Sequence, residues 1–409
     1  MLFNYSQEVA IDAGVNHILQ RKPWALQISG KAGTGKSVVA REIQRRSGIH
    51  WERFAPMAYI GQAAIIMRLK GFPNAKTCHS WLYDVEIDNL KDKETNMDKI
   101  DPYFAIAEKG IKFVPRELDD IDVIMLDEGG TVPLKMKPHI ESHNKPIIVT
   151  GDANQLPPVK DEPAYLTDPS QIIFLTEVMR QQGNSSILYL ADRALAGLPI
   201  HRGVYGDSMV ISDDQLTNDM LMRADMILSG TNATRDSINR IVRQEILGFR
   251  GTLPNYGEKL ICRKNNWALN VDGIGLGNGL TGRVINQPEI TDFDGKVFYI
   301  DFKPDLFNGV FTRLDVNYKY FNTPCVDKKN LVMSKWDTGE HFEFAYCITT
   351  HLAQGGQAPF VIYFEEPSMP MLRDRLNYTG ITRAESRLIY VKRRKLYQVK
   401  PMSFFNKRG

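Results

Sequence analysis

The 409-residue sequence has few cysteines, no long apolar run and no strong net charge. Its four cysteines, Cys78, Cys262, Cys325 and Cys347, lie far apart and form no CxxC or metal-ligand spacing. We therefore expect reduced thiols in a cytoplasmic protein. No run approaches the roughly 18 apolar residues of a membrane-spanning helix. The sequence begins without a basic segment followed by an apolar one, so we expect no signal peptide and no membrane partner.

The charge balance excludes little, because 51 basic and 48 acidic residues leave a formal net charge of only +3. Basic residues gather near the end of the sequence, in VKRRKLYQVK (391–400) and NKRG (406–409). A basic stretch of this kind is usually just solvated, although it also suits a nucleic-acid binder. Composition therefore leaves the function open, and the motifs have to decide it.

Two parts of the sequence alternate strand-like and helix-like segments. In the first part, the apolar runs LQIS (26–29), DVIMLDE (122–128) and KPIIVTGD (145–152) are typical of buried parallel strands. The second part repeats the pattern with runs such as DMILSG (225–230) and APFVIYF (358–364). The alternation predicts two α/β units, each with ligands at the carboxyl ends of its strands.

Two stretches interrupt this alternation. Residues 84–118 are charged and irregular, whereas residues 280–337 alternate polar and apolar residues between turn signals, as in KVFYIDFKPD (296–305). Alternation with a period of two is typical of half-buried strands. We therefore expect the second stretch to be a small β insertion.

The strongest local signal is GKAGTGKS (30–37), which matches GxxxxGK[ST] between a predicted strand and a predicted helix. Glycines let the backbone N–H groups of such a loop surround phosphates, and the helix N-terminus favours their negative charge. Lys36 is expected to reach the β- and γ-phosphates, and Ser37 to hold Mg²⁺. The predicted nucleotide-binding residues are Gly30, Lys31, Ala32, Gly33, Thr34, Gly35, Lys36 and Ser37.

Acidic and amide side chains follow the next two predicted strands. In LDEGG (126–130), Asp127 is placed to bind the Mg²⁺ shell, and Glu128 to orient or deprotonate the attacking water. In GDANQLPPV (151–159), Gln155 is expected to sense the γ-phosphate. An Asp–Glu pair in this position favours hydrolysis over nucleotide sensing alone.

In their order along the chain, these motifs resemble superfamily 1 helicases, specifically the RecD-like and Dda-like group. The resemblance extends to the family's adenine-reading glutamine, its DNA-contacting segments and its later motifs: Gln7 in NYSQEVAID, AYIGQAA (58–64), KTCHSWLY (76–83), LTEVMRQ (175–181), SGTNATRDSIN (229–239), YCITTHLAQGGQ (346–357) and YTGITRA (378–384). It implies a DNA helicase that couples Mg-ATP hydrolysis to 5′→3′ movement on single-stranded DNA and to duplex unwinding.

The resemblance implies an α/β fold with two RecA-like P-loop NTPase domains that sandwich ATP. The first domain carries a small pin insertion, and the second an SH3-like β insertion. Phe104 and Phe113 are candidate wedge residues of the pin, although a buried aromatic is as good an interpretation of either. The implied boundaries are 1–83 and 119–185 for the first motor domain, 84–118 for the pin, 186–279 and 338–409 for the second motor domain, and 280–337 for the β insertion.

The resemblance also assigns roles to side chains outside the phosphate loop. Lys36, Glu128 and Gln155 are implied to act in catalysis together with two arginines, Arg180 and Arg383. An arginine aimed at the γ-phosphate is worth ~10³–10⁵ in rate. Near the nucleotide the family places Gln7, Gln354 and Gly355. The implied DNA contacts are short polar or aromatic side chains, namely Tyr59, Gln62, Thr77, His79, Thr231, Asn232, Thr349 and His351.

The sequence departs from the family pattern at several loop positions. Gln62 and Leu352 stand where lysine is usual, and Gln357 where glutamate is common. The segment THLAQGGQ (350–357), which resembles motif V, is therefore free of formal charge. We expect a monomer in a bacterial or phage-infected cell, with single-stranded DNA and duplex junctions as partners. Single-stranded-DNA-binding or replisome proteins are further expected partners.

Three alternatives remain open at this point. An AAA+-type loader or another P-loop ATPase would share the phosphate loop, but it would take its arginine from a neighbouring subunit. A non-catalytic nucleic-acid-binding scaffold would keep only the fold. RNA in place of DNA is a third possibility, because salt-dependent binding is expected for either strand.

Overall fold

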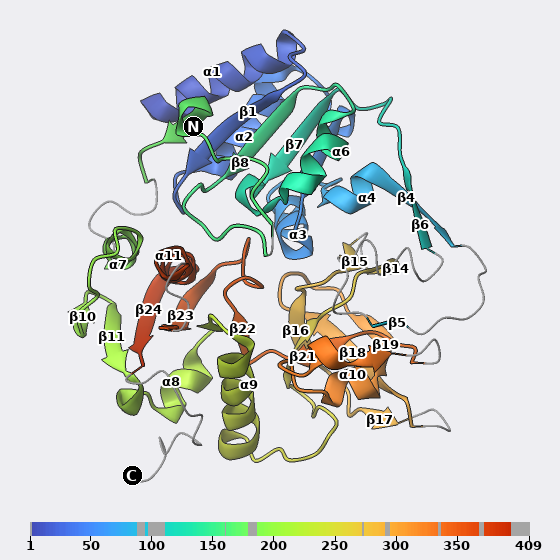
Figure 1. Cartoon of the computed structure of the whole chain (residues 1–409), viewed down its shortest axis with the longest axis vertical. Helices are drawn as coiled ribbons and strands as arrows, with labels where there is room; N and C mark the ends of the chain where they lie inside the picture. Colours follow the sequence, from blue (N-terminus) through green and yellow to red (C-terminus); the bar gives the residue numbers. More distant parts are fainter. Residues whose placement is uncertain are drawn as a thin grey trace. The chain divides into compact units, whose positions relative to one another are not determined.

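The computed structural model describes residues 2–87, 95–96, 111–159, 161–178, 186–271, 274–290, 295–333, 337–367 and 372–393. The chain forms two compact units (Figure 1). We call them the first unit (Met1–Asp84, Val114–Ala196 and Gln354–Gly356) and the second unit (Val85–Phe113, Gly197–Ala353 and Gln357–Gly409). Among the described residues, no helix is long and apolar enough to cross a membrane.

The first unit is built on a six-stranded sheet of order β3–β2–β7–β8–β1–β9, in which every pair is parallel. All residues of β2 and β8 are buried, as expected for strands covered on both faces. The strands are β1 (Ala25–Gly30), β2 (Phe54–Ala58), β3 (Lys76–Thr77), β7 (Val123–Asp127), β8 (Ile147–Gly151) and β9 (Ile172–Leu175).

Helices pack on this sheet through an apolar core that includes Ile11, Ile28 and Ile43. Gly14 lets two of them approach closely, because a Cβ there would lie 2.5 Å from the Ile43 Cδ1 atom. The helices are α1 (Tyr5–Leu19), α2 (Lys36–Ser47), α3 (Gly61–Leu69), α4 (Cys78–Leu82), α6 (Lys137–Glu141) and α7 (Ser186–Leu195), with 3-10 turns η1 (Trp51–Arg53), η2 (Gly129–Thr131), η3 (Leu134–Met136) and η4 (Pro169–Gln171).

The second unit contains a six-stranded sheet of order β10–β11–β24–β23–β12–β22, parallel except for the β10–β11 pair. Its strands are β10 (Gly203–Tyr205), β11 (Ser208–Ser212), β12 (Met226–Ser229), β22 (Cys347–Thr349), β23 (Ala358–Phe364) and β24 (Ala384–Lys392). The helices around it are η5 (Asp213–Gln215), α8 (Asn218–Arg223), α9 (Asn232–Arg240), the π-helix η6 (Ile241–Ile246) and α11 (Arg373–Ile381). The prediction of an α/β fold with two such sheets is confirmed.

A separate antiparallel sheet lies within the second unit, in the order β17–β18–β16–β13–β21 with β19 paired to β18. Its strands are β13 (Lys259–Cys262), β16 (Thr281–Val284), β17 (Glu289–Ile290), β18 (Val297–Pro304), β19 (Phe311–Asn317) and β21 (Phe342–Phe344). The sheet thus takes in strands on both sides of the predicted insertion at 280–337. Associated with it are the hairpin β14 (Asn266–Val271) and β15 (Ile274–Leu276), the helix α10 (Tyr318–Asn322) and the turn η7 (Lys328–Asn330).

The stretch expected to form a pin is described only in part. The strands β4 (Tyr83–Ile87) and β6 (Ile111–Pro115) pair with each other, and β5 (Thr95–Asn96) pairs with β20 (Val332–Met333). The pin insertion expected at 84–118 therefore stays a prediction. Phe104 and the side chain of Phe113 lie outside the described residues.

Candidate nucleotide and nucleic-acid sites

The phosphate-binding loop joins the carboxyl end of β1 to the start of α2. Gly33 and Gly35 both have a φ of 85°, a left-handed conformation that glycine adopts without steric cost. Gly30 has no room for a side chain, because a Cβ would lie 2.3 Å from Thr34 Oγ1. The three glycines are thus required by the path of the backbone, which leads directly into the N-terminus of a 12-residue helix.

Lys36, the first residue of that helix, is folded back onto its own loop. Its Nζ atom donates to the carbonyl oxygens of Gly30, at 2.7 Å, and Lys31, at 3.1 Å. Both acceptors are neutral, so an arriving phosphate would offer the ammonium group a stronger, charge-assisted partner. The Lys31 side chain instead forms an ion pair with Asp192 on α7.

Gln7 is tied to the same loop. Its Nε2 atom donates to the carbonyl oxygen of Thr34 at 3.0 Å. Its own Oε1 accepts from Asn4 N, as part of the capping box at the start of α1. A Cβ on Gly35 would lie 2.6 Å from Gln7 Nε2. The amide predicted to read adenine is therefore held against the loop that is predicted to hold the phosphates.

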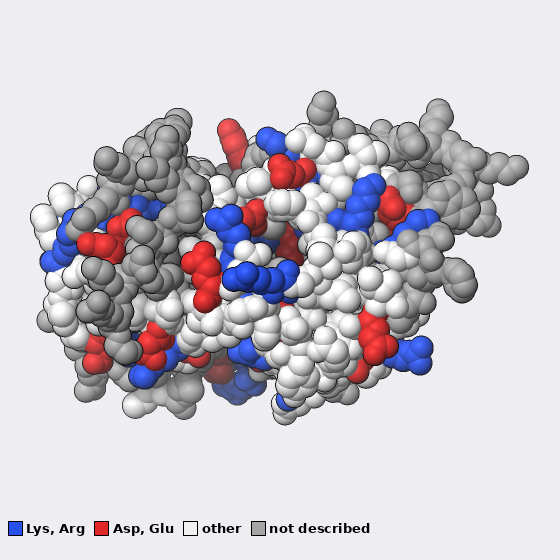
Figure 2. All heavy atoms as spheres, turned by 90° about the horizontal axis from the view of Figure 1, so that it is seen from below, with Lys and Arg blue, Asp and Glu red and all other residues white. Residues whose placement is uncertain are grey.

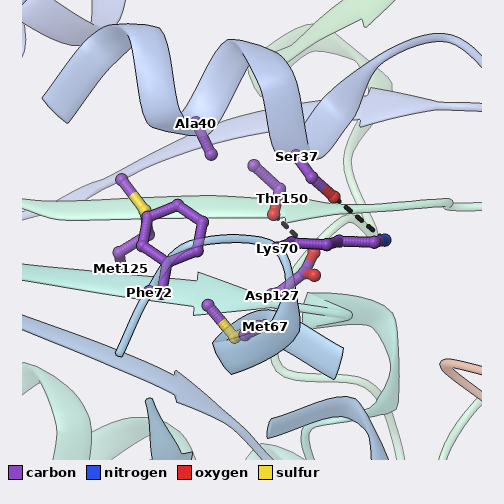
Figure 3. A pocket seen from close by; sticks show the side chains of 8 residues that line it. All are labelled: Ser37, Ala40, Met67, Lys70, Phe72, Met125, Asp127 and Thr150. Atoms are coloured by element: carbon purple, nitrogen blue, oxygen red, sulfur yellow. Dashed lines mark hydrogen bonds between the residues drawn. The ribbon is translucent and has the colours of Figure 1, made fainter. Parts of the chain in front are cut away.

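Ser37 and Asp127, the predicted metal ligands, line one small cavity together with Lys70 and Thr150 (Figure 3). Asp127 Oδ1 accepts a 2.6 Å hydrogen bond from Thr150 Oγ1, on the neighbouring strand β8. Ser37 Oγ accepts a 3.2 Å hydrogen bond from Lys70 Nζ. Figure 3 shows the polar atoms of these four side chains at one end of the cavity, with apolar side chains at the other.

One carboxylate and one hydroxyl fit Mg²⁺, which prefers oxygen ligands and usually completes its shell with water and substrate phosphates. In the part of the chain that the structure describes, no group of three or more His, Cys, Asp or Glu residues could hold a metal unaided. One carboxylate and one hydroxyl leave most of a Mg²⁺ shell to water and phosphate oxygens, so this donor set suits a metal that arrives with a nucleotide.

Glu128 follows the strand in a strained conformation. Its φ of 53° is in the left-handed region, which non-glycine residues rarely adopt. Gly129 must be glycine here, because a Cβ would lie 2.3 Å from Val149 Cγ1. Thr131 closes the turn by donating from its backbone and its hydroxyl to Glu128 O. Strain of this kind concentrates at functional sites, where it fixes the direction of a side chain.

Gln155 is buried, and its Oε1 finds no hydrogen-bond partner among the described residues. An amide oxygen buried in this way costs roughly 1–3 kcal/mol, so its retention favours a role with a bound ligand. The next residue, Leu156, accepts a 2.9 Å hydrogen bond from Gln354 Nε2. Gly355, the residue after Gln354, has a φ of 83°, and a Cβ on it would lie 2.9 Å from Ala63 Cβ. Gln354 and Gly355, which are predicted to lie near the nucleotide, thus belong to the first unit, where Gln354 contacts the residue after Gln155.

Of the two predicted catalytic arginines, Arg383 belongs to the described residues. Arg383 lies between α11 and β24 in the second unit and is almost fully buried. Its Nε atom donates to the Thr379 carbonyl oxygen at 3.2 Å. Arg180 lies outside the described residues.

Four predicted DNA contacts come from the first unit. The rings of Tyr59 and His79 are 5.5 Å apart, and burial raises the pKa of Tyr59 to about 12 and lowers that of His79 to about 4. Both rings are therefore neutral near pH 7. Thr77 is buried and caps α4 by accepting from Ser80 N. Gln62 is also buried, with no partner for its Oε1 in the described residues.

The other four predicted contacts come from the second unit. Thr231 caps α9 by accepting from Thr234 N and donates to Glu366 Oε1 at 3.2 Å. Asn232, the first residue of that helix, is exposed. Thr349 is buried at the end of β22, and burial lowers the pKa of the half-buried His351. Of this group, Asn232 is the residue most open to a ligand.

These candidate contacts are uncharged at neutral pH. Figure 2 shows basic and acidic side chains interspersed among neutral ones on the face that it presents. That pattern agrees with a formal net charge of only +3.

The structure adds two residues that the sequence did not single out. Thr150, which binds Asp127, directly precedes the predicted motif GDANQLPPV and could have been noticed from that position. Lys70 belongs to no motif, since it lies at the end of α3 and reaches Ser37 only through the fold.

Comparisons with known proteins address both ends of the chain. Residues 6–198 match the AAA domain family, and residues 344–391 match the UvrD-like helicase C-terminal domain. A Pif1 helicase from Candida albicans is 17% identical, with a TM-score of 0.55 over 95% of this chain and 94% of that one. A Bacteroides Pif1 bound to ssDNA is 15% identical, with a TM-score of 0.54 over 95% and 92%. A complex of Bacteroides Pif1 with ADP-AlF3 and ssDNA is 15% identical, with a TM-score of 0.52 over 97% and 94%.

At this level of identity the solved structures establish the shared fold, and the C-terminal match adds the helicase assignment. Residues 6–198 thus match an AAA domain and residues 344–391 a UvrD-like helicase C-terminal domain, which together support a superfamily 1 helicase. The resemblance read from the motifs is thereby confirmed. The AAA match includes the phosphate loop and Asp127, and the helicase match includes THLAQGGQ and Arg383. The two family matches support an ATP-hydrolysing helicase.

Proposed function

We propose that this helicase couples Mg-ATP hydrolysis to 5′→3′ translocation on single-stranded DNA and to duplex unwinding. The observation that carries the proposal is the convergence of the phosphate loop, Ser37 and Asp127 at the carboxyl edge of a parallel sheet. Ligands bind at this edge in open α/β sheets. The helicase match of residues 344–391 supports a motor in place of a nucleotide sensor.

In the proposed reaction, Lys36 binds the β- and γ-phosphates, and Ser37 and Asp127 hold Mg²⁺. The metal neutralises charge on the phosphates when it is bound. Glu128, fixed by its strained backbone, orients the attacking water, and Gln155 senses the γ-phosphate. Arg180 and Arg383 stabilise the charge that spreads over the transferred phosphoryl group.

The strand-binding residues follow from the same assignment. Tyr59, His79, Asn232 and His351 offer aromatic and amide groups that suit base stacking and phosphate contacts. Two structures of Bacteroides Pif1, which shares this fold, contain ssDNA, which supports the choice of DNA. Gln62, Thr77, Thr231 and Thr349 are proposed to act through local rearrangement or backbone groups, because the side chains are buried or engaged in capping.

Partial duplexes with a single-stranded tail test this function. The protein is given DNA and RNA duplexes with either a 5′ or a 3′ tail, and strand separation is followed with ATP and Mg²⁺. We expect unwinding of the DNA duplex with the 5′ tail. Unwinding from 3′ tails alone would overturn the polarity, and a preference for RNA would overturn the substrate.

The dependence of ATPase activity on protein concentration separates this proposal from a ring-forming ATPase. A monomeric helicase should show DNA-stimulated hydrolysis with a constant specific activity on dilution. A ring ATPase, which takes its arginine from a neighbouring subunit, would lose specific activity as the assembly dissociates.

A further inference from the structure

Lys70 places a second ammonium group at the phosphate-binding edge of the first unit. Its Nζ atom lies 3.2 Å from Ser37 Oγ, in the cavity that also contains Asp127 and Thr150 (Figure 3). Ser37 is the hydroxyl proposed to hold Mg²⁺, so this inference rests on the proposed function. Lys70 belongs to none of the sequence motifs that describe the site.

The backbone that carries Lys70 is well fixed. Its N–H donates to the Ile66 carbonyl oxygen at 3.0 Å, and the next residue, Gly71, has a φ of 96°. A Cβ on Gly71 would lie 2.9 Å from the Arg41 guanidinium carbon, on α2. Phe72, which follows, is buried against the same core. The backbone at Lys70 is therefore fixed at the end of α3, while its side chain is exposed and reaches Ser37.

Lys70 is held at Ser37 by a neutral group only. No carboxylate pairs with its ammonium group within the described ranges of the chain, and Asp127 is engaged by Thr150. A lysine ammonium has three donors, and the hydrogen bond to Ser37 uses one. A lysine held in this way can transfer to an anion without first breaking an ion pair.

A metal on Ser37 would bring a second cation close to this ammonium group. Mg²⁺ lies about 2.1 Å from its ligand oxygens, so two positive charges would share the same hydroxyl. Their repulsion is relieved if the ammonium moves to a phosphate oxygen. We propose that Lys70 is a second phosphate-binding lysine, which occupies the metal-ligand hydroxyl in the nucleotide-free protein and transfers to the nucleotide phosphates on binding.

The proposal predicts how nucleotide affinity depends on magnesium. Lys70 supplies positive charge to the phosphates with or without the metal, and its share is larger when the metal is absent. Replacing it should therefore weaken binding in EDTA more than binding in Mg²⁺. The diagnostic quantity is the ratio of the two dissociation constants, which does not require turnover.

The experiment measures the Kd of a fluorescent ADP analogue in Mg²⁺ and in EDTA. Lys70→Met keeps the stem and removes the charge, Lys70→Arg keeps the charge, and Lys22→Met is the matched control. Lys22 precedes β1, so it lies at the opposite end of the strand from the phosphate loop. A charge-assisted hydrogen bond is worth about 10-fold or more in affinity, so Lys70→Met should lose about that factor in EDTA and less in Mg²⁺.

The expected result is a raised EDTA-to-Mg²⁺ ratio for Lys70→Met and a wild-type ratio for Lys70→Arg and Lys22→Met. An unchanged ratio in Lys70→Met would overturn the proposal, as would an equal loss in both conditions. If the wild-type protein bound no nucleotide at all, the proposed function itself would fail. Thermal unfolding of each variant checks that the fold is intact.

Discussion

The phosphate loop of the first unit and the charge cluster around Glu343 in the second unit both concentrate cationic side chains, but with opposite partners. In the loop, Lys36 is held by neutral carbonyl oxygens. In the cluster, three cations converge on the buried Glu343 carboxylate: Arg235, Arg263 and Lys328. The ammonium of Lys328 also lies 3.5 Å from the centre of the Tyr320 ring.

Burial and neighbouring charges shift the pKa values of the cluster in opposite directions. Burial acts to raise the pKa of Glu343, because it disfavours the charged form, but the surrounding cations outweigh it and hold the pKa well below its usual range. For Lys328 burial is the larger effect, and its pKa is lowered despite the nearby carboxylate. The charges of the cluster are therefore paired with one another, although Arg235 Nε has no hydrogen-bond partner among the described residues. Removing one charged partner would leave the others buried and uncompensated.

The cations of the phosphate loop are placed to bind a ligand, whereas those of the Glu343 cluster stabilise the fold. Cations that rest on neutral oxygens can transfer to an arriving anion, whereas cations that share a buried carboxylate are committed to the fold. Variants in the loop should therefore change chemistry without changing stability. Variants in the cluster should do the reverse.

The largest expected effect is that of Lys36→Ala. Removal of the ammonium group that is predicted to reach the β- and γ-phosphates should lower ATPase turnover by about 10³-fold. The free energy of unfolding should be almost unchanged, because only neutral acceptors lose a partner. Steady-state ATPase assays and urea unfolding measure the two quantities. Wild-type turnover in this variant would show that the nucleotide site lies elsewhere.

Glu343→Gln should have the opposite profile. Breaking a buried charge network by removing one partner typically costs about 3–5 kcal/mol, here because three cations would share no carboxylate. Urea unfolding should show this loss, while nucleotide affinity stays at the wild-type value. Glu42→Gln is a suitable control, because Glu42 also pairs with two arginines but on the surface of α2. An exposed pair of this kind contributes about 1 kcal/mol or less.

The same contrast explains what the sequence could predict. The phosphate loop was readable because Gly33 and Gly35 adopt a φ that glycine alone tolerates well, so the sequence pattern reports the backbone directly. Asp127 was readable because it ends an apolar strand that follows this loop. Lys70 was not, since its distance to Ser37 depends on how α3 returns toward α2.

The charge cluster around Glu343 could not be predicted from the sequence, for a different reason. Glu343 alternates with Phe342 and Phe344 along β21, and a period of two predicts that the glutamate faces water. Arg235 from α9 and Lys328 from η7 cover that face instead. β21 and β13 were also missed at the ends of the β insertion, because strands of three and four residues carry little periodicity.

The smallest expected effect is the pH dependence of the free energy of unfolding. His79 in the first unit and Glu343 in the second unit should contribute to it in different pH ranges. Burial lowers the pKa of His79 from 6.5 to about 4, so the folded first unit keeps this ring neutral where the unfolded chain is protonated. The unfolded state therefore binds more protons between these values, and stability is present above pH 6.5 and lost as the pH falls toward 4. At 1.36 kcal/mol per pKa unit, the loss is at most about 3 kcal/mol.

Glu343 has a lowered pKa as well, but its window lies lower. Its contribution is present above the ordinary carboxyl value of 4.5 and is lost only as the pH falls below that value. Unfolding free energies measured from pH 7 to 4.5 should therefore decline in the wild type and decline less in His79→Phe, which keeps a ring beside Tyr59. Glu343→Gln should keep the wild-type slope over that range, although at lower stability. An identical slope in His79→Phe would show that burial of this histidine does not control the acid sensitivity of the first unit.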